Sequence, residues 1–248
     1  MNKILTIIIS LSFTSIYSQS LFFSEVAEGS SSNKYIEIFN GTSGDIDLSN
    51  YSISKCSNGC DQDGQFDYPD HLTFQSGTIL PAGELYVVSD DNADNYILAR
   101  ADLYPSYVYF SNGDDFLALT EVSTGIVLDK IGDFGADPGS GWNVAGVENG
   151  TRDHTLVRKP SVTTGNTDWS SSAGTDTDNS EWIVYEQNYW DNIGIHTWEP
   201  PVSIVYNRFN VSTSGSDSNN GSESSPFATI QAGINAASDG DTVLVQPG

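Results

Sequence analysis

Three carboxylates spaced around a glycine are the first groups in this sequence that could bind a metal ion. Residues 61–67 read DQDGQFD, and hard cations such as Ca²⁺ prefer oxygen ligands. Leu72 stands where an EF-hand loop has its bidentate glutamate, so the loop is not an EF-hand. Two interpretations fit the residues: a looser calcium site formed by Asp61, Asp63 and Asp67, or a solvated acidic turn.

A second acidic pair, Asp114 and Asp115, follows an Asn-Gly dipeptide. This pair also places carboxylate oxygens beside a glycine, and we take it as the second candidate for calcium. Asp, Asn and Gly are also the residues that tight turns favour, because their side chains or backbones suit turn geometry. Turn chemistry alone therefore also explains the pair.

The two cysteines enclose a short turn. Cys56 and Cys60 flank the sequence SNG, and in an oxidising compartment such a pair predicts a local disulfide. A metal pair is the alternative, but the sequence has no third cysteine and only His71 lies nearby. The spacing also differs from the C-x-x-C of redox-active pairs.

Motifs of hydrolytic or phosphate-binding sites are missing from the sequence. It contains no G-x-S-x-G, no H-E-x-x-H and no G-K-[ST] loop. The histidines His71, His154 and His196 are scattered, and Asp153 next to His154 would point to the opposite face of a strand. We therefore predict no catalytic residue in this chain.

Tryptophans gather in the second half of the chain. Aromatic rings could form a platform that stacks on sugar rings, or they could fill the core of a β-sandwich. The sequence leaves both interpretations open for Trp142, Trp169, Trp182, Trp190 and Trp198.

The charge of the chain and its first residues indicate export. The sequence has 33 acidic residues against 9 Lys and Arg, a net charge of -24, which would repel a nucleic-acid backbone. Lys3, an apolar run over 4–13 and small or polar residues over 15–20 are typical of a signal peptide. The apolar run is too short to span a bilayer. We predict a secreted or cell-surface protein without a membrane span.

Short apolar stretches separated by turn residues predict an all-β sandwich. A short helix is expected within 91–101. The expected strands are 21–26, 35–39, 85–88, 107–110, 116–119, 125–131 and 182–185.

This region resembles the lamin-tail domains of secreted bacterial proteins. The resemblance begins with LFFSEVAEGSSSNKYIEIFN at 21–40 and continues in family order with DLSNY (47–51), LPAG (80–83), NGDD (112–115), DKIG (129–132) and TLVRK (155–159). It covers 21–197 and implies an immunoglobulin-like sandwich with a binding, anchoring or structural role. Such domains accompany secreted nucleases, phosphatases, proteases and surface proteins, and the family carries no catalytic residues onto this chain.

Composition changes after this region. A Pro-containing linker is expected at 198–208. Residues 209–217 (FNVSTSGSD), 225–231 (SPFATIQ) and 240–245 (GDTVLV) resemble the opening of a right-handed parallel β-helix, as in pectate-lyase-like enzymes and adhesins. Phe227, Ile230 and Ile234 fall at helical spacing, so we expect a capping helix. Because one coil cannot bury its apolar face alone, 209–248 is expected to be the truncated start of that domain.

Two functions remain open at this point. The chain is either a non-catalytic accessory, adhesion or anchoring module of a secreted multidomain protein, or the N-terminal part of a β-helix polysaccharide lyase or hydrolase. An extracellular polysaccharide or cell-surface component is the expected partner, calcium is the one candidate cofactor, and nucleic acid is disfavoured.

Overall fold

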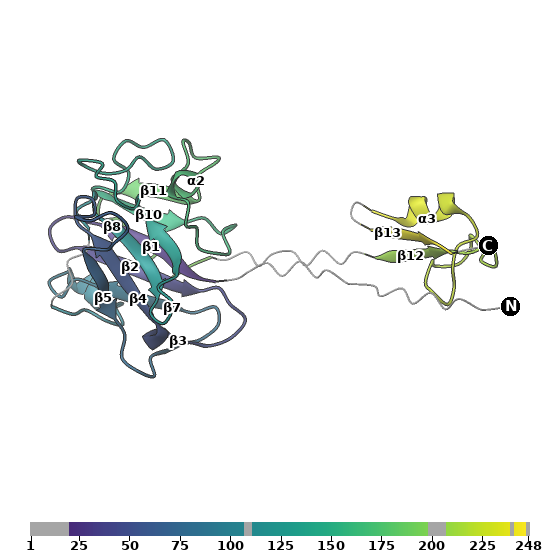
Figure 1. Ribbon diagram of the computed structural model, residues 1–248, viewed down its shortest axis with the longest axis horizontal. Helices are drawn as coiled ribbons and strands as arrows, with labels where there is room; N and C mark the ends of the chain where they lie inside the picture. The colour runs from purple at the N-terminus through teal and green to yellow at the C-terminus, as the bar shows by residue number, and fades with distance from the viewer. Residues whose placement is uncertain (1–19, 107–110, 198–206, 239–240, 247–248) are drawn as a thin grey trace. The chain divides into compact units, whose positions relative to one another are not determined.

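The computed structural model describes residues 20–106, 111–197, 207–238 and 241–246 (Figure 1). The chain divides into two compact units, 1–201 and 202–248. The predicted signal peptide, apart from Ser20, lies outside the described residues, as do the expected strand 107–110 and most of the expected linker. In the part of the chain that is described, no helix is long and apolar enough to cross a membrane.

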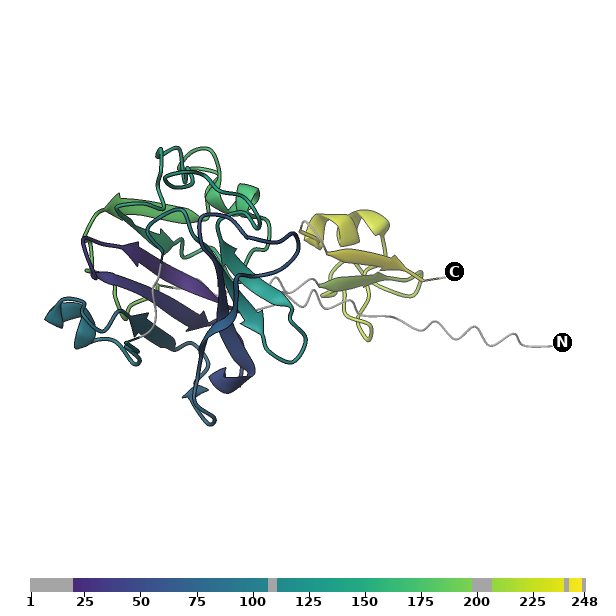
Figure 2. The same cartoon turned by 60° about the vertical axis from the view of Figure 1, so that its left-hand side comes forward.

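The first unit contains two main antiparallel sheets, which Figures 1 and 2 show as stacked layers. One sheet has the order β11-β10-β1-β2-β7, the other β5-β4-β8-β9, and β3 pairs with β6. The bounds are β1 Leu21–Glu28, β2 Lys34–Asn40, β3 Ile46–Asp47, β4 Tyr51–Cys56, β5 Tyr68–Thr73, β6 Ile79–Leu80, β7 Leu85–Ser89, β8 Phe116–Glu121, β9 Val127–Ile131, β10 His154–Arg158 and β11 Trp182–Glu186. The short helices are η1 Leu48–Asn50, α1 Asn95–Leu98 and α2 Trp169–Ala173.

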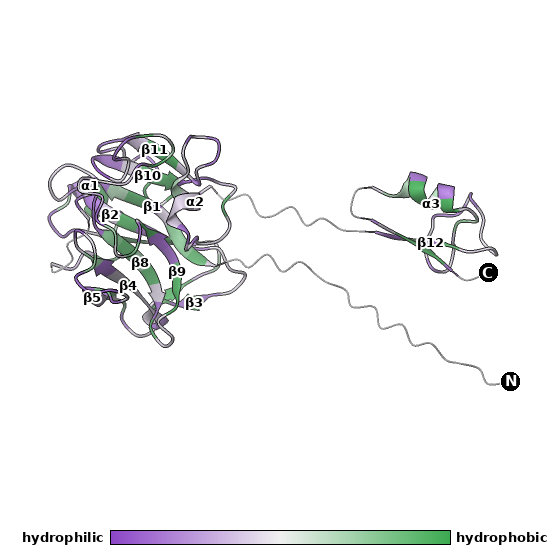
Figure 3. Cartoon of the chain, turned by 45° about the horizontal axis from the view of Figure 1, so that its top comes forward, coloured by the Kyte–Doolittle hydropathy of each residue, from purple (hydrophilic) through white to green (hydrophobic). Residues whose placement is uncertain are grey.

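Apolar side chains from the facing sides of the two sheets form the main core. Phe23 and Ile36 of the five-stranded sheet share one buried cluster with Ile53 and Leu119 of the four-stranded sheet. Figure 3 shows apolar residues concentrated along these strands. The sheet-rich fold confirms the predicted immunoglobulin-like sandwich at the level of architecture.

A buried ion pair also joins the two sheets. Arg158 of β10 and Asp129 of β9 form a salt bridge in which both side chains are 0% exposed. The Arg158 guanidinium also donates to the Phe23 carbonyl (3.1 Å) and to Glu181 (2.6 Å), and lies 3.9 Å from the centre of a Trp182 ring. Such a group needs all of these partners, because a buried charge is costly when it is left unpaired.

The outer face of the five-stranded sheet is covered as well. All eight residues of β1 are buried, because α1 and residues 187–197, which we call the strap, pack over this face. Trp190 and Ile193 of the strap contact a cluster that contains Tyr35, and Ile97 of α1 belongs to the same cluster. The sheet is therefore sandwiched between the main core and this second, smaller layer.

Six of the seven expected strands are present, and α1 lies within the expected helix 91–101. In the first unit the structure adds β4, β5 and β10 and the two-residue strands β3 and β6, none of which the apolar pattern revealed. In β4 the polar Ser52, Ser54 and Lys55 are buried, and in β5 most residues are exposed. The alternation of apolar and polar residues in β4 lasts only from Tyr51 to Ser54 before Lys55 interrupts it, and β5 has no such alternation.

The second unit contains a parallel strand pair. β12 (Arg208–Val211) pairs with β13 (Thr242–Val245), and α3 (Ile230–Ala236) lies between them in sequence. The helix begins after the Thr229 N-cap, so Phe227 precedes it rather than belonging to it. Phe227 is buried, whereas Ile230 and Ile234 are 52% and 53% exposed.

Candidate functional site

The predicted disulfide is present at one end of the four-stranded sheet. Cys56 is the last residue of β4, and its sulfur is bonded to that of Cys60, with the two Cα atoms 4.9 Å apart. Asn58 and Gly59 both have positive φ, 52° and 89°, which is the backbone geometry that Asn and Gly tolerate. The Asn-Gly dipeptide therefore forms the turn that brings the two cysteines together.

Two of the expected calcium ligands also form hydrogen bonds with that loop. The Asp67 carboxylate accepts hydrogen bonds from the backbone N–H groups of Ser57 (3.0 Å) and Asp61 (2.7 Å). The Asp115 carboxylate accepts from the N–H of Asn58 (3.1 Å) and forms an ion pair with Lys55 (3.0 Å). These carboxylates fix the backbone, which is a common role of Asp in turns.

The other three predicted calcium ligands differ in their exposure to solvent. Asp61 and Asp63 are exposed, whereas Asp114 is buried, and burial, with a contribution from Asp115, raises the pKa of Asp114. Within the described residues, no three His, Cys, Asp or Glu side chains are grouped as metal ligands would be. A calcium site at 61–67 or 114–115 stays a prediction.

None of the three histidines has a hydrogen bond to a carboxylate among the described residues. His154 Nδ1 contacts the carbonyl of Arg152 (2.5 Å). His196, in the strap, lies between the rings of Phe22 and Phe39. Burial, and then the nearby Arg158, lower the pKa of His196 to about 4, so this ring is neutral and serves as a packing group.

The tryptophans have different roles. Trp169 and Trp182 are buried in the main core, and Trp190 belongs to the strap layer. Trp198 lies outside the described residues. Trp142 packs in the main core and also lines a cleft. The described tryptophans therefore do not share one surface platform.

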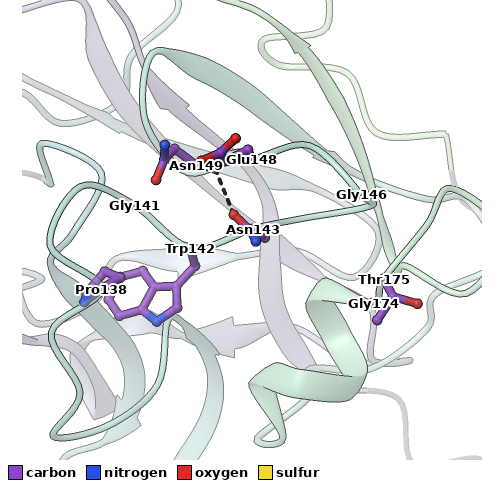
Figure 4. Close-up of a pocket in the computed structure, with 9 residues that line it drawn as sticks. All are labelled: Pro138, Gly141, Trp142, Asn143, Gly146, Glu148, Asn149, Gly174 and Thr175. Carbon is purple, nitrogen blue, oxygen red and sulfur yellow. Dashed lines mark hydrogen bonds between the residues drawn. The ribbon is translucent and has the colours of Figure 1, made fainter.

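An open cleft of about 680 Å³ lies in the first unit (Figure 4). A ligand pocket typically has a volume of this order. It is lined by Pro138, Gly141, Trp142, Asn143, Gly146, Glu148, Asn149, Gly174 and Thr175. Three of the lining residues are glycines, whose lack of a side chain leaves the polar groups of the lining accessible.

A small hairpin builds the cleft. Val144 and Val147 form an isolated antiparallel bridge, and the amide group of Ala145 donates to the carbonyl of Ala173 (2.8 Å), which ties the hairpin to α2. The Asn143 side chain accepts from the N–H of Asn149 (3.0 Å), as Figure 4 shows. The Trp142 ring is fixed on Gly132, where a Cβ would lie 2.6 Å from the ring.

Sequence reasoning missed this cleft. The only signal is the density of Gly and Asn over 139–150, and these residue types are equally typical of turns. The cleft presents the amides of Asn143 and Asn149, the carboxylate of Glu148 and the hydroxyl of Thr175, next to the partly exposed Trp142. Such a mixture can hydrogen-bond to the hydroxyl groups of a polar ligand.

A second set of titratable groups is buried under the strap. Glu25 and Glu37 are opposite each other in β1 and β2. Burial, opposed by the hydrogen bond from Tyr35, raises the pKa of Glu25 to about 8. Burial also raises the pKa of Glu37 to about 7. These side chains are enclosed, so they cannot act on a substrate in this conformation.

The comparisons with known proteins agree with this fold. No curated protein matches the chain. The family model of the lamin tail domain matches residues 14–134, which end before β10 and β11, so the match is shorter than the range 21–197 suggested by the sequence motifs. Together with the sheet-rich architecture, it supports a lamin tail domain, an immunoglobulin-like module, in the first unit of this chain.

Proposed function

We propose that the first unit is a non-catalytic accessory module of a secreted or cell-surface protein and that its open cleft binds an extracellular polysaccharide. The cleft carries this proposal, because it presents amide, carboxylate and hydroxyl groups beside Trp142 in one accessible hollow. The lamin tail domain match supports a module without catalytic function. The signal-like first residues support export.

The lining suits a sugar for a physical reason. A sugar ring offers many hydroxyl groups, which need both donors and acceptors, and amides supply both. Its C–H faces are apolar and pack on an aromatic edge, which Trp142 supplies. An open, shallow cleft fits a chain of sugars better than a small apolar ligand, which needs an enclosed cavity.

Binding of the full chain to a panel of insoluble polysaccharides would test this function. Glu148 and Thr175 are exposed, so Glu148→Ala and Thr175→Ala should leave the fold unchanged and together weaken the affinity about tenfold or more. Asp178, exposed outside the cleft lining, provides the matched control Asp178→Ala. Equal binding by all variants, or no binding to any polysaccharide, would refute the proposal.

An enzymatic role is the second candidate, and the parallel pairing of β12 with β13 favours it. We propose that the second unit is the opening coil of a parallel β-helix. The pairing runs in register from Arg208 opposite Thr242 to Val211 opposite Val245, and parallel strands need a crossover connection, which contains α3. Exposed Leu244 and Val245 offer an apolar surface for a further coil.

An assay for new reducing ends separates the two functions. Degradation of a polysaccharide that the protein binds would favour the enzyme, and binding without degradation would favour the module. Hydrogen exchange tests the coil itself, because the amides of β12 and β13 should be protected together. Rapid exchange in both strands would argue against the coil.

A further inference from the structure

Two buried glutamates lie side by side under the strap. Glu25 and Glu37 are cross-strand partners and each is 0% exposed. A buried carboxylate is costly unless a cation pairs with it. Among the ion pairs of the described residues, none includes either glutamate. The pair therefore favours its neutral, protonated form while it is covered.

The strap bonds directly to one of these carboxyl groups. Glu37 Oε2 accepts from the N–H of Gly194 in the strap (2.7 Å), and its Oε1 accepts from the Ser24 hydroxyl (2.7 Å). Glu25 accepts from the Tyr35 hydroxyl, and its second oxygen has no partner. Trp190 Nε1 of the strap also lacks a partner. The strap is thus held mainly by apolar contacts, and it covers two carboxyl groups that do not have all of their hydrogen-bond partners.

The geometry points to a pH-controlled strap: residues 187–197 stay closed over Glu25 and Glu37 while both carboxyl groups are protonated, and open when they ionise. Ionised carboxylates need water or a cation, and the sheet below supplies neither. The strap is the element that can move away, because its Gly194 bond and the contacts of Trp190 and Ile193 are what cover the pair.

The pKa values in the closed state determine whether closure strengthens or weakens as the pH rises. The ordinary pKa of a glutamate here is 4.5, and in the closed state it is about 8 for Glu25 and about 7 for Glu37. An acid whose pKa is raised by closure stabilises the closed state below 4.5, and this stabilisation is lost as the pH rises through 7 and 8. His196 has the opposite dependence, because its pKa falls from 6.5 to about 4 on burial. Above pH 4.5 the two glutamates outweigh the single histidine, so closure should be strongest at about pH 4–4.5 and weaken as the pH rises further.

Other charged and titratable side chains surround the pair. Asp102 raises the pKa of Glu37 further, and Tyr35 stays neutral because burial raises its pKa. Among the described residues, no Lys or Arg forms an ion pair with either carboxylate, and Arg100 and Arg158 act only through Tyr96 and His196. The groups that act on the pair, directly or through a neighbour, are Tyr35, Tyr96, Arg100, Asp102, Arg158, Tyr185, Tyr189, Asp191 and His196.

Hydrogen exchange of the full chain, read by mass spectrometry and corrected for the intrinsic pH dependence, tests the strap. Ionisation of Glu25 alone should raise the opening equilibrium constant of 187–197 about 50-fold between about pH 6 and pH 8. Ionisation of Glu37 should add about tenfold. Peptides from β4 and β8 should keep their protection over this range.

Substitutions test whether Glu25 and Glu37 cause the pH dependence of strap opening. Glu25→Gln should remove most of the rise, and Glu37→Gln, whose side-chain oxygen can still accept from Gly194, should remove the smaller part. Glu84→Gln is the control, because Glu84 is exposed and the charge change is the same. Trp190→Ala should open the strap at pH 6 without any ionisation. Corrected exchange that does not vary with pH, or a Glu25→Gln variant with the wild-type rise, would overturn the proposal.

Discussion

Replacing Arg158 with Met should cost more stability than any other single charge removal in the first unit. The guanidinium is fully buried between the sheets and donates to the Phe23 carbonyl, the Ser172 hydroxyl (3.0 Å) and the carboxylates of Asp129 and Glu181. Its loss would leave Asp129 buried without a cation. Burial already raises the pKa of Asp129, against the opposing effect of Arg158.

The magnitude follows from the burial of each partner. Breaking a fully buried ion pair costs roughly 3–5 kcal/mol, whereas an ion pair with an exposed partner contributes about 0–1 kcal/mol. The Glu181 side chain is 25% exposed, so water can solvate it and it adds little. We therefore expect Arg158→Met to lower the free energy of unfolding by about 4 kcal/mol, most of it from Asp129.

Urea unfolding of the full chain, followed by tryptophan fluorescence, measures this loss, because Trp182 stacks on Arg158. Arg152→Met is the matched control, since the Arg152 side chain is 51% exposed and forms its ion pair with the exposed Asp153. The double variant Asp129→Asn/Arg158→Met should lose less than the sum of the single variants. A loss below about 1 kcal/mol for Arg158→Met, or one equal to that of the control, would refute this reasoning.

Three further predictions concern the loops and the connection between units. Cys56→Ser/Cys60→Ser should lower the free energy of unfolding by about 2 kcal/mol, because the disulfide closes a short loop; an unchanged urea midpoint would contradict this. Asp67→Ala should lower the melting temperature equally with calcium and with a chelator, because Asp67 accepts two backbone hydrogen bonds; a loss seen only with calcium would instead reveal a metal site. Limited proteolysis should cut within 199–225 and leave a stable core upstream, because the chain divides at 201/202; equal resistance of 226–248 would disprove the separation.

Strands were predictable where apolar residues dominate. The run over 21–26 led to β1, although it contains Ser24 and Glu25, which are both buried. Nothing in the sequence placed Glu25 opposite Glu37, because the pairing depends on a register shift between Phe23 and Glu25. A bulge of this kind moves every following side chain relative to its partner strand.

The candidate site was harder to predict, because carboxylates have several uses. Asp67 and Asp115 are predicted calcium ligands, and each accepts a hydrogen bond from a backbone N–H group of the disulfide loop. Sequence spacing cannot separate these roles, since both need an Asp beside a turn. The cleft depends on the hairpin around Ala145 and Gly146 and on its hydrogen bond to α2. This bond joins segments that are distant in sequence, so a local sequence pattern cannot predict it.

The strap has a mechanical consequence. It is the last described part of the first unit, so a force applied through the following chain acts on it before it reaches the sandwich. The strap is held by side-chain packing and single bonds such as that from Gly194 to Glu37, which separate one after another under load. Its 11 residues could then release at most about 40 Å of extended chain. The β-sheet would stay folded, and the strap would serve as an extensible element that absorbs load.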